Sequence, residues 1–273
     1  MRARKRFAQH FLESAWVTKL VKAVDAQPDQ SILEIGPGQG AITRPLAAAA
    51  RRILAVEVDR DLAADLSRNK PDNVTVVTGD VLSVDLAAVL SDWLGGPIGP
   101  DRQVRAVGNL PYNISSPILF RLLDLSATTG GLTDAILMLQ KEVADRLAAR
   151  VGTGDYGVLT ILTALHADVS RLLSLPPGAF RPQPKVHSTV IRLKFRAPQI
   201  DVAAPDRFVR MVRTMFTQRR KTLTNALKPF ASEGSIDSAS ALVAAGIDGR
   251  RRPETLAMDE LAALARAFDK PGS

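Results

Sequence analysis

The feature that most constrains the fold is a regular alternation of short apolar runs and helical segments between residues 31 and 139. The apolar runs are rich in branched side chains and occupy residues 31–35, 53–56, 74–77, 104–107 and 135–139. Segments with helical spacing lie between them at residues 42–49, 62–68, 86–93 and 118–125. This alternation predicts an α/β fold with a doubly wound, mostly parallel sheet. Residues 189–195 mix apolar and polar positions, which predicts an added antiparallel strand at or near the sheet edge.

The character of the sequence changes after Phe195. Residues 196–205 are linker-like, and from Asp206 onward only helical patterns remain, interrupted by prolines and glycines. We therefore expect a larger domain over residues 1–200 and a small, all-helical domain over residues 201–273.

Composition excludes several kinds of site. The chain of 273 residues has no cysteine, which rules out disulfides, thiolate metal ligands and cysteine nucleophiles. No apolar run approaches eighteen residues, and the N-terminus lacks the apolar segment of a signal peptide. We expect a soluble, cytoplasmic protein that has no membrane span and needs no metal.

The net charge of +8 makes a polyanion a plausible partner. Basic residues gather in two places, near the N-terminus and in the predicted helical domain. They are Arg2, Arg4, Lys5 and Arg6, and then Arg219, Arg220 and Lys221 with Arg207, Arg210 and Arg213 upstream at helical spacing. Such clusters can simply be solvated faces, but they also suit phosphate contacts along RNA or DNA.

A glycine-rich loop follows the first predicted strand, in the sequence Glu-Ile-Gly-Pro-Gly-Gln-Gly-Ala at residues 34–41. Glycines allow a tight turn and a close approach of the backbone to a ligand. Gly36 and Gly38 with Ala41 satisfy the relaxed dinucleotide fingerprint, and with Gly40 they are typical of an S-adenosylmethionine loop. A turn without a ligand is the structural alternative.

Acidic residues end the next two predicted strands. Glu57 stands about twenty residues after the glycines, where a carboxylate accepts hydrogen bonds from both ribose hydroxyls. Asp80 ends the third strand, and a strand order of 3-2-1-4 places Gly36, Glu57 and Asp80 around one crevice. Asp80 would accept from the adenine amine while Val81 packs on the ring; its alternative role is a helix N-cap.

The fourth predicted strand ends in Asn109-Leu110-Pro111-Tyr112. Pro111 has no N–H and restricts Leu110 to extended geometry, so this corner presents two acceptors, the Asn109 side-chain oxygen and the Leu110 carbonyl. Two acceptors hold both protons of an exocyclic amine and favour a nitrogen whose lone pair points at an electrophile. Tyr112 would stack on the base. A structural turn is the alternative, but beside an adenosine site the four residues indicate catalysis of amine methylation.

Segments that match the sequence motifs of one known protein family occur along the whole chain. They are residues 4–12, 34–38, 57–59, 79–80, 108–115, 139–147, 180–188 and 216–223. On these segments the chain resembles the KsgA-type (RsmA) ribosomal RNA small-subunit adenine N6,N6-dimethyltransferases from end to end. The resemblance implies a class I S-adenosylmethionine-dependent methyltransferase fold, with that compound as methyl donor. It also implies RNA contacts through Arg219, Arg220 and Lys221 in the small domain.

The resemblance also assigns roles near the N-terminus and at residue 180. His10 and Leu12 match a family segment that folds over the cofactor, but His10 replaces the family's asparagine. Histidine can still donate from one ring nitrogen, so the contact would become pH-sensitive, or His10 is merely tolerated there. Phe180 matches an aromatic that faces the target base across from Tyr112, with a core anchor for a proline-stiffened loop as the alternative.

The implied function is dimethylation of two adjacent adenosines in the 3′-terminal hairpin loop of 16S ribosomal RNA. The implied partner is an immature 30S particle late in its assembly, and we expect a monomer. Leu110 and Tyr112 separate this branch from Erm-type large-subunit methyltransferases, which often carry isoleucine or valine and phenylalanine there. The Erm-type activity and a non-catalytic assembly factor remain alternatives. A nicotinamide oxidoreductase function would leave the Asn109 corner unexplained. An adenine deaminase function would need zinc ligands that this chain lacks.

Overall fold

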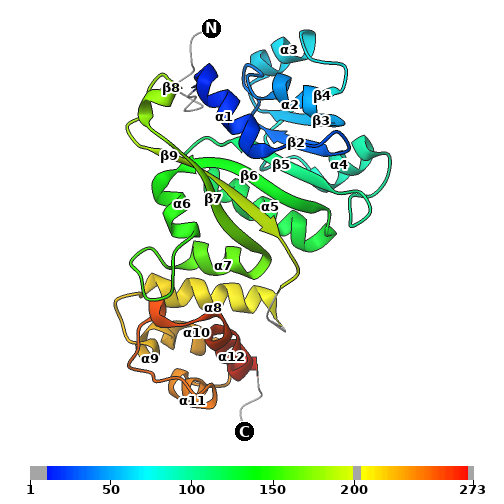
Figure 1. The fold of residues 1–273 in the computed structure, drawn as a ribbon. Helices are drawn as coiled ribbons and strands as arrows, with labels where there is room; N and C mark the ends of the chain where they lie inside the picture. Colours follow the sequence, from blue (N-terminus) through cyan, green and yellow to red (C-terminus); the bar gives the residue numbers. More distant parts are fainter. Residues whose placement is uncertain (1–10, 199–203, 270–273) are drawn as a thin grey trace. The chain divides into compact units, whose positions relative to one another are not determined.

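The computed structural model describes residues 11–198 and 204–269. Residues 31–195 contain a seven-stranded sheet with the order β4-β3-β2-β5-β6-β9-β7 (Figure 1). The strands are β2 (Ser31–Ile35), β3 (Arg52–Glu57), β4 (Val74–Thr78), β5 (Val104–Asn109), β6 (Leu132–Gln140), β7 (Ala167–Leu175) and β9 (Ser188–Phe195). Strands β2 to β6 pair in parallel, so the predicted order 3-2-1-4 is confirmed.

The antiparallel strand predicted from residues 189–195 is β9, which runs antiparallel to both β6 and β7. It lies one strand in from the edge, and the edge strand is β7, which the sequence pattern did not predict. Most residues of β7 are at least partly exposed, so it carries no continuous apolar run.

Helix α1 (Ser14–Val24) precedes β2. Four further helices connect the parallel strands: α2 (Thr43–Ala49), α3 (Arg60–Arg68), α4 (Leu86–Leu94) and α5 (Ser115–Thr129). The starts of α3 and α4 are capped by aspartates: Asp59 accepts from the backbone N–H groups of Asp61 and Leu62, and Asp85 accepts from Ala88. Helix α5 ends at Gly130, whose φ of 65° suits a left-handed C-cap. The predicted helices are confirmed, and the doubly wound sheet brings the carboxyl ends of β2 to β5 to one edge.

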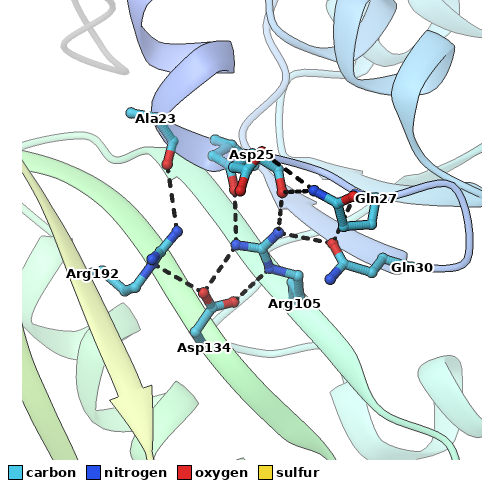
Figure 2. A network of polar contacts seen from close by, with 8 residues as sticks. Ala23, Asp25, Gln27, Gln30, Arg105, Asp134 and Arg192 are labelled. Atoms are coloured by element: carbon cyan, nitrogen blue, oxygen red, sulfur yellow. Dashed lines mark hydrogen bonds and ion pairs between the residues drawn. The ribbon is translucent and has the colours of Figure 1, made fainter.

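A buried polar network closes the opposite, amino-terminal end of the sheet (Figure 2). Arg105 of β5 is 7% exposed and contacts both carboxylate oxygens of Asp134 in β6, at 2.7 and 3.0 Å. Arg105 also donates to the carbonyls of Val24 and Asp25 at the end of α1. Arg192 of β9 lies 3.2 Å from the same carboxylate. One buried aspartate therefore joins three strands, and Arg105 adds the end of a helix.

A separate short ribbon pairs β1 (Phe11–Leu12) with β8 (Phe180–Arg181) in antiparallel register. Phe180 is opposite Leu12, and the backbone N–H of Glu13 donates to the Ala179 carbonyl at 2.9 Å. An exposed ion pair joins Glu13 to Arg181 at 3.1 Å. The ribbon attaches the start of the described chain to the segment that precedes β9.

The chain divides into two compact units, and the division differs from the single boundary expected near residue 200. The first comprises Met1–Ala144 and His166–Arg196, and the second comprises Asp145–Leu165 and Ala197–Ser273. Residues 145–165 join the second unit because Gly152 donates to the Glu254 carbonyl and Tyr156 to that of Leu256, at 2.7 and 2.9 Å. These partners lie about a hundred residues away, so helical periodicity alone did not reveal them.

The described part of the second unit is built from helices. They are α7 (Val158–His166), α8 (Pro205–Thr217), α9 (Leu223–Ala226), α10 (Lys228–Ala231), α11 (Ser238–Ala244) and α12 (Met258–Asp269), while α6 (Lys141–Leu147) crosses the division. Its core includes Phe208, Met211, Leu227, Leu261 and Phe268. Among the residues the structure describes, no helix has both the length and the apolar character needed to cross a bilayer.

Candidate functional site

A cleft of about 290 Å³ opens at the carboxyl ends of β2, β3, β4 and β5. It lies in the first unit and brings together most of the predicted site. The predicted residues that line it are Leu12, Gly36, Gly38, Glu57, Asp80, Val81, Asn109, Leu110, Pro111 and Tyr112. Its volume is at the lower end of the range for small-molecule sites.

The floor of the cleft is the glycine loop. Gly36, Gly38 and Gly40 have φ angles of 67°, 58° and 75°, a region that side chains of other residues rarely adopt. A side chain at Gly38 would also meet the ring of Phe11, 3.5 Å from the position of its first carbon. The loop therefore depends on glycine for its backbone path, and the Phe11 ring lies within ordinary contact distance above it.

Glu57, the last residue of β3, is 5% exposed and fixes this loop from below. Its Oε2 accepts from the Gly38 N–H and its Oε1 from the Asp59 N–H, both at 2.9 Å. Burial raises the pKa of Glu57, while these backbone hydrogen bonds lower it. Each carboxylate oxygen has two lone pairs, so both can accept a further hydrogen bond from a vicinal diol.

Asp80 follows β4, and its side chain serves a turn as well as the cleft. Its Oδ1 accepts from the Leu82 N–H at 2.9 Å, which holds a turn. Asp80 is not a helix N-cap, because the next helix, α4, begins at Leu86 and is capped by Asp85. The carboxylate retains acceptor capacity beyond the bond to Leu82. Val81 beside it is 6% exposed and supplies an apolar surface.

The Asn109 corner closes the cleft on the side of β5. Leu110 is 1% exposed, and its N–H donates to the Met138 carbonyl at 3.3 Å, which holds the corner to β6. Pro111 contributes no donor. The Tyr112 hydroxyl lies 2.7 Å from the Ser188 Oγ. Burial raises the pKa of the Tyr112 phenol, against the effect of the Ser188 hydrogen bond.

Two residues that were predicted to contribute to the cleft are not among those that line it. His10, like the basic group from Arg2 to Arg6, lies outside the described residues. Phe180 is fully buried, at 0% exposure, in the hydrophobic core with Leu175 and Ala179, and it does not line the cleft. Its ring fills the core because β8 pairs with β1 above the sheet. The base-facing role gains no support from this position, which is that of a core anchor.

The predicted RNA residues of the second unit also differ from one another. Arg219 donates to the carbonyls of Gly154 and Thr153, at 2.5 and 3.0 Å, and lies 3.6 Å from a Glu254 carboxylate oxygen. It therefore fastens the loop before α7. Arg220 and Lys221 are exposed and available to a polyanion. The predicted RNA contacts of Arg219, Arg220 and Lys221 stay a prediction, and Arg219 has a structural role in addition.

Two contributors were not assigned a role from the sequence. Phe11 lines the cleft opposite Gly38, and its position next to Leu12 was the available signal. Glu34 of β2 is 1% exposed beneath the glycine loop. Burial raises its pKa from 4.5 to about 7, with a smaller contribution from the negative charge of Glu57.

Glu34→Gln is expected to change the pH dependence of stability. The unfolded chain ionises Glu34 near pH 4.5 and the folded protein near 7, so raising the pH through this window favours unfolding. The shift corresponds to about 3 kcal/mol, which the wild type loses by pH 7 and the variant does not. Urea unfolding at pH 4.5 and pH 8 measures the difference between the two proteins. Parallel curves would contradict this assignment.

Comparisons with known proteins identify the family to which these cleft residues point. The sequence matches the family described as ribosomal RNA adenine dimethylase over residues 1–270. A ribosomal RNA small subunit methyltransferase A from Geobacter metallireducens is 44% identical over 273 residues, covering 98% of this chain and 96% of that protein. A protein of the same name from Pseudomonas fluorescens is 42% identical, covering 98% of this chain and 94% of that protein.

Solved structures confirm the predicted fold class. A dimethyladenosine transferase from Plasmodium falciparum superposes with a TM-score of 0.73 at 22% identity, covering 95% of this chain and 98% of that chain. The 23S rRNA methyltransferase ErmE superposes with a TM-score of 0.64 at 27% identity, covering 95% of this chain and all of that chain. Both superpositions cover 95% of this chain, so the fold is shared.

The family match and the curated relatives extend over nearly the whole chain, including both units. The cleft supplies, on neighbouring strand ends, the glycine loop, the two acids and the Asn109 corner that carried the resemblance. The chain belongs to the ribosomal RNA adenine dimethylase family.

Proposed function

We propose that this protein transfers two methyl groups to N6 of each of two adjacent adenosines in the 3′-terminal hairpin loop of small-subunit ribosomal RNA. The observation that carries the proposal is that the Asn109 corner, residues 109–112, lines the same cleft as Gly38 and Glu57. The names of the relatives at 42–44% identity support the small subunit as substrate. ErmE, named for 23S RNA, is a more distant relative at 27% identity.

S-adenosylmethionine is the methyl donor of this family, and the residues of the cleft fit it. Glu57 presents two oxygens that suit the ribose hydroxyls, and Asp80 with Val81 suits the adenine amine and ring. The glycine loop leaves space above Gly38, where a side chain would approach Phe11. When bound, S-adenosylmethionine would supply an electrophilic methyl group carried on a sulfonium.

The protein's own residues then act on the target amine. The Asn109 side-chain oxygen and the Leu110 carbonyl accept its two N–H donors, which directs the nitrogen lone pair toward the methyl carbon. The corner would point this lone pair at the methyl group that the bound donor supplies, and the nitrogen would lose one proton only after the transfer. Because the proton leaves afterward, no strong general base is needed, which is consistent with a corner that offers only weak acceptors. A second methyl transfer to the same nitrogen gives the dimethylated amine.

Methylation of small-subunit particles that lack the modification tests this function. Product nucleotides are mapped after reaction with labelled S-adenosylmethionine, with large-subunit RNA as the parallel substrate. We expect dimethyladenosine at two adjacent positions of the small-subunit hairpin loop. Methylation confined to large-subunit RNA would instead assign the Erm-type activity. We further propose that the protein acts as a cytoplasmic monomer on an immature 30S particle.

Changing Arg220 and Lys221 together to glutamine is expected to weaken RNA binding and its salt dependence. Removing one cation that neutralises a phosphate lowers the slope of log affinity against log salt by about 0.7 to 0.9, so the pair lowers it by about 1.4 to 1.8. Arg219→Met is expected to reduce thermal stability with a smaller change in slope, because its guanidinium holds backbone carbonyls. Equilibrium RNA binding across a salt series measures both variants. An unchanged slope in the double variant would place RNA binding on other residues.

A further inference from the structure

The hydrogen bond between Tyr112 and Ser188 connects the mouth of the cleft to the sheet. The two hydroxyl oxygens lie 2.7 Å apart, across a separation of 76 residues in sequence. Tyr112 is partly exposed and lines the cleft, whereas Ser188 is fully buried at 0% exposure. The bond therefore joins a side chain that a substrate can reach to one that it cannot.

The two partners differ in how firmly the fold holds them. Ser188 begins β9 and is paired on both sides, with Gln140 of β6 and Leu175 of β7. Tyr112 lies in the turn between β5 and α5, outside any helix or strand. A hydrogen bond at the far end of the phenol restrains rotation about its side-chain bonds, so Ser188 helps to set the direction of the ring.

The same stretch of chain holds a second wall of the cleft. Phe180 of β8 is opposite Leu12, which also lines the cleft, and Ala179 accepts from Glu13. Residues 179–188 thus fix the Leu12 side through the ribbon and the Tyr112 side through Ser188. This arrangement gives the segment a role in cleft geometry that does not require Phe180 to touch the base.

We propose that Ser188 is a positioning residue for methyl transfer, which holds the Tyr112 ring in the orientation that stacks on the target adenine. The proposal rests on the proposed function, because the stacked base is its substrate. Misorientation of a stacked base displaces its amine from the Asn109 corner, so loss of the bond lowers the rate of transfer more than it lowers binding. Ser188 itself touches neither the base nor the methyl donor.

The test is a double-mutant cycle with Ser188→Ala, Tyr112→Phe and the combined variant. Each single change removes one hydroxyl and keeps the ring, so each is expected to lower kcat about 3- to 10-fold, as for one hydrogen bond. The combined variant is expected to be no slower than either single variant, because the same bond is absent in all three. Affinity for S-adenosylmethionine and KM for the RNA particle stay within about twofold, and Ser188→Thr restores part of kcat.

Ser31→Ala is the matched control. Ser31 is also buried and accepts a hydrogen bond, from Arg52 at 3.2 Å, but it lies at the amino end of β2. We expect unchanged kcat, with a loss of thermal stability like that of Ser188→Ala. Multiplied losses in the combined variant, or full kcat in Ser188→Ala, would overturn the proposal. Absence of methylation by the wild type would instead overturn the proposed function.

Discussion

Asn109→Ala is expected to reduce methyl transfer at least about 100-fold while RNA binding is retained. The change removes one of the two acceptors that we propose orient the target amine, and loss of a comparable preorganised polar group in other enzymes slows catalysis about 10²- to 10³-fold. The side chain stands at the end of β5, where the backbone is fixed by pairing with β6. Single-turnover transfer to unmodified small-subunit particles measures the rate, and equilibrium binding measures the affinity for RNA.

The control for this variant is Asn69→Ala at the end of α3, where an exposed asparagine donates only to a local carbonyl. It should methylate at the wild-type rate. Wild-type turnover by Asn109→Ala would remove the Asn109 corner from the mechanism. Loss of RNA binding in step with activity would indicate a substrate-binding role instead.

Arg105→Met is expected to lower the free energy of unfolding by about 3 to 5 kcal/mol, because it leaves a buried carboxylate short of a partner. Asp134 would keep only Arg192, which lies at 3.2 Å and is partly exposed. The carbonyls of Val24 and Asp25 would also lose their donor. Urea unfolding at neutral pH measures the loss.

Arg68→Met provides the comparison for a surface pair. Arg68 contacts Asp65 at 3.1 Å, with 69% and 48% of the two side chains exposed, and such a pair contributes at most about 1 kcal/mol. A decrease of less than about 1 kcal/mol in Arg105→Met would show that the network is no more important than this surface pair.

The sheet was largely predictable because buried parallel strands have a simple sequence signal. All five residues of β2 are buried, and β3 is buried except for its first residue, so most of their positions are apolar even though β2 contains Glu34 and β3 ends in Glu57. Strand β7 lies at the sheet edge, and its partly exposed residues hide it from the same reasoning. The apolar sequence pattern therefore predicted the interior strands of the sheet but not the edge strand β7.

The candidate site was predictable where function depends on backbone position and less so where it depends on side-chain direction. Gly36, Glu57 and Asp80 follow strand ends, and the order of the strands is enough to bring them together. The direction of Phe180 and Arg219 is set by partners that no local pattern specifies, such as the Thr153 carbonyl for Arg219. The bond from Tyr112 to Ser188 is equally remote in sequence.

Strand β5 begins next to the buried ion network and ends at the corner that we propose acts in catalysis. Arg105 and Asn109 are four positions apart along an extended chain, roughly 13 Å, with paired β-structure between them. Damage at the two ends should therefore have different phenotypes in a living cell. Heat-sensitive alleles that regain methylation on cooling should map to the Arg105 end, and alleles that yield abundant but inert protein at every temperature should map to the Asn109 end.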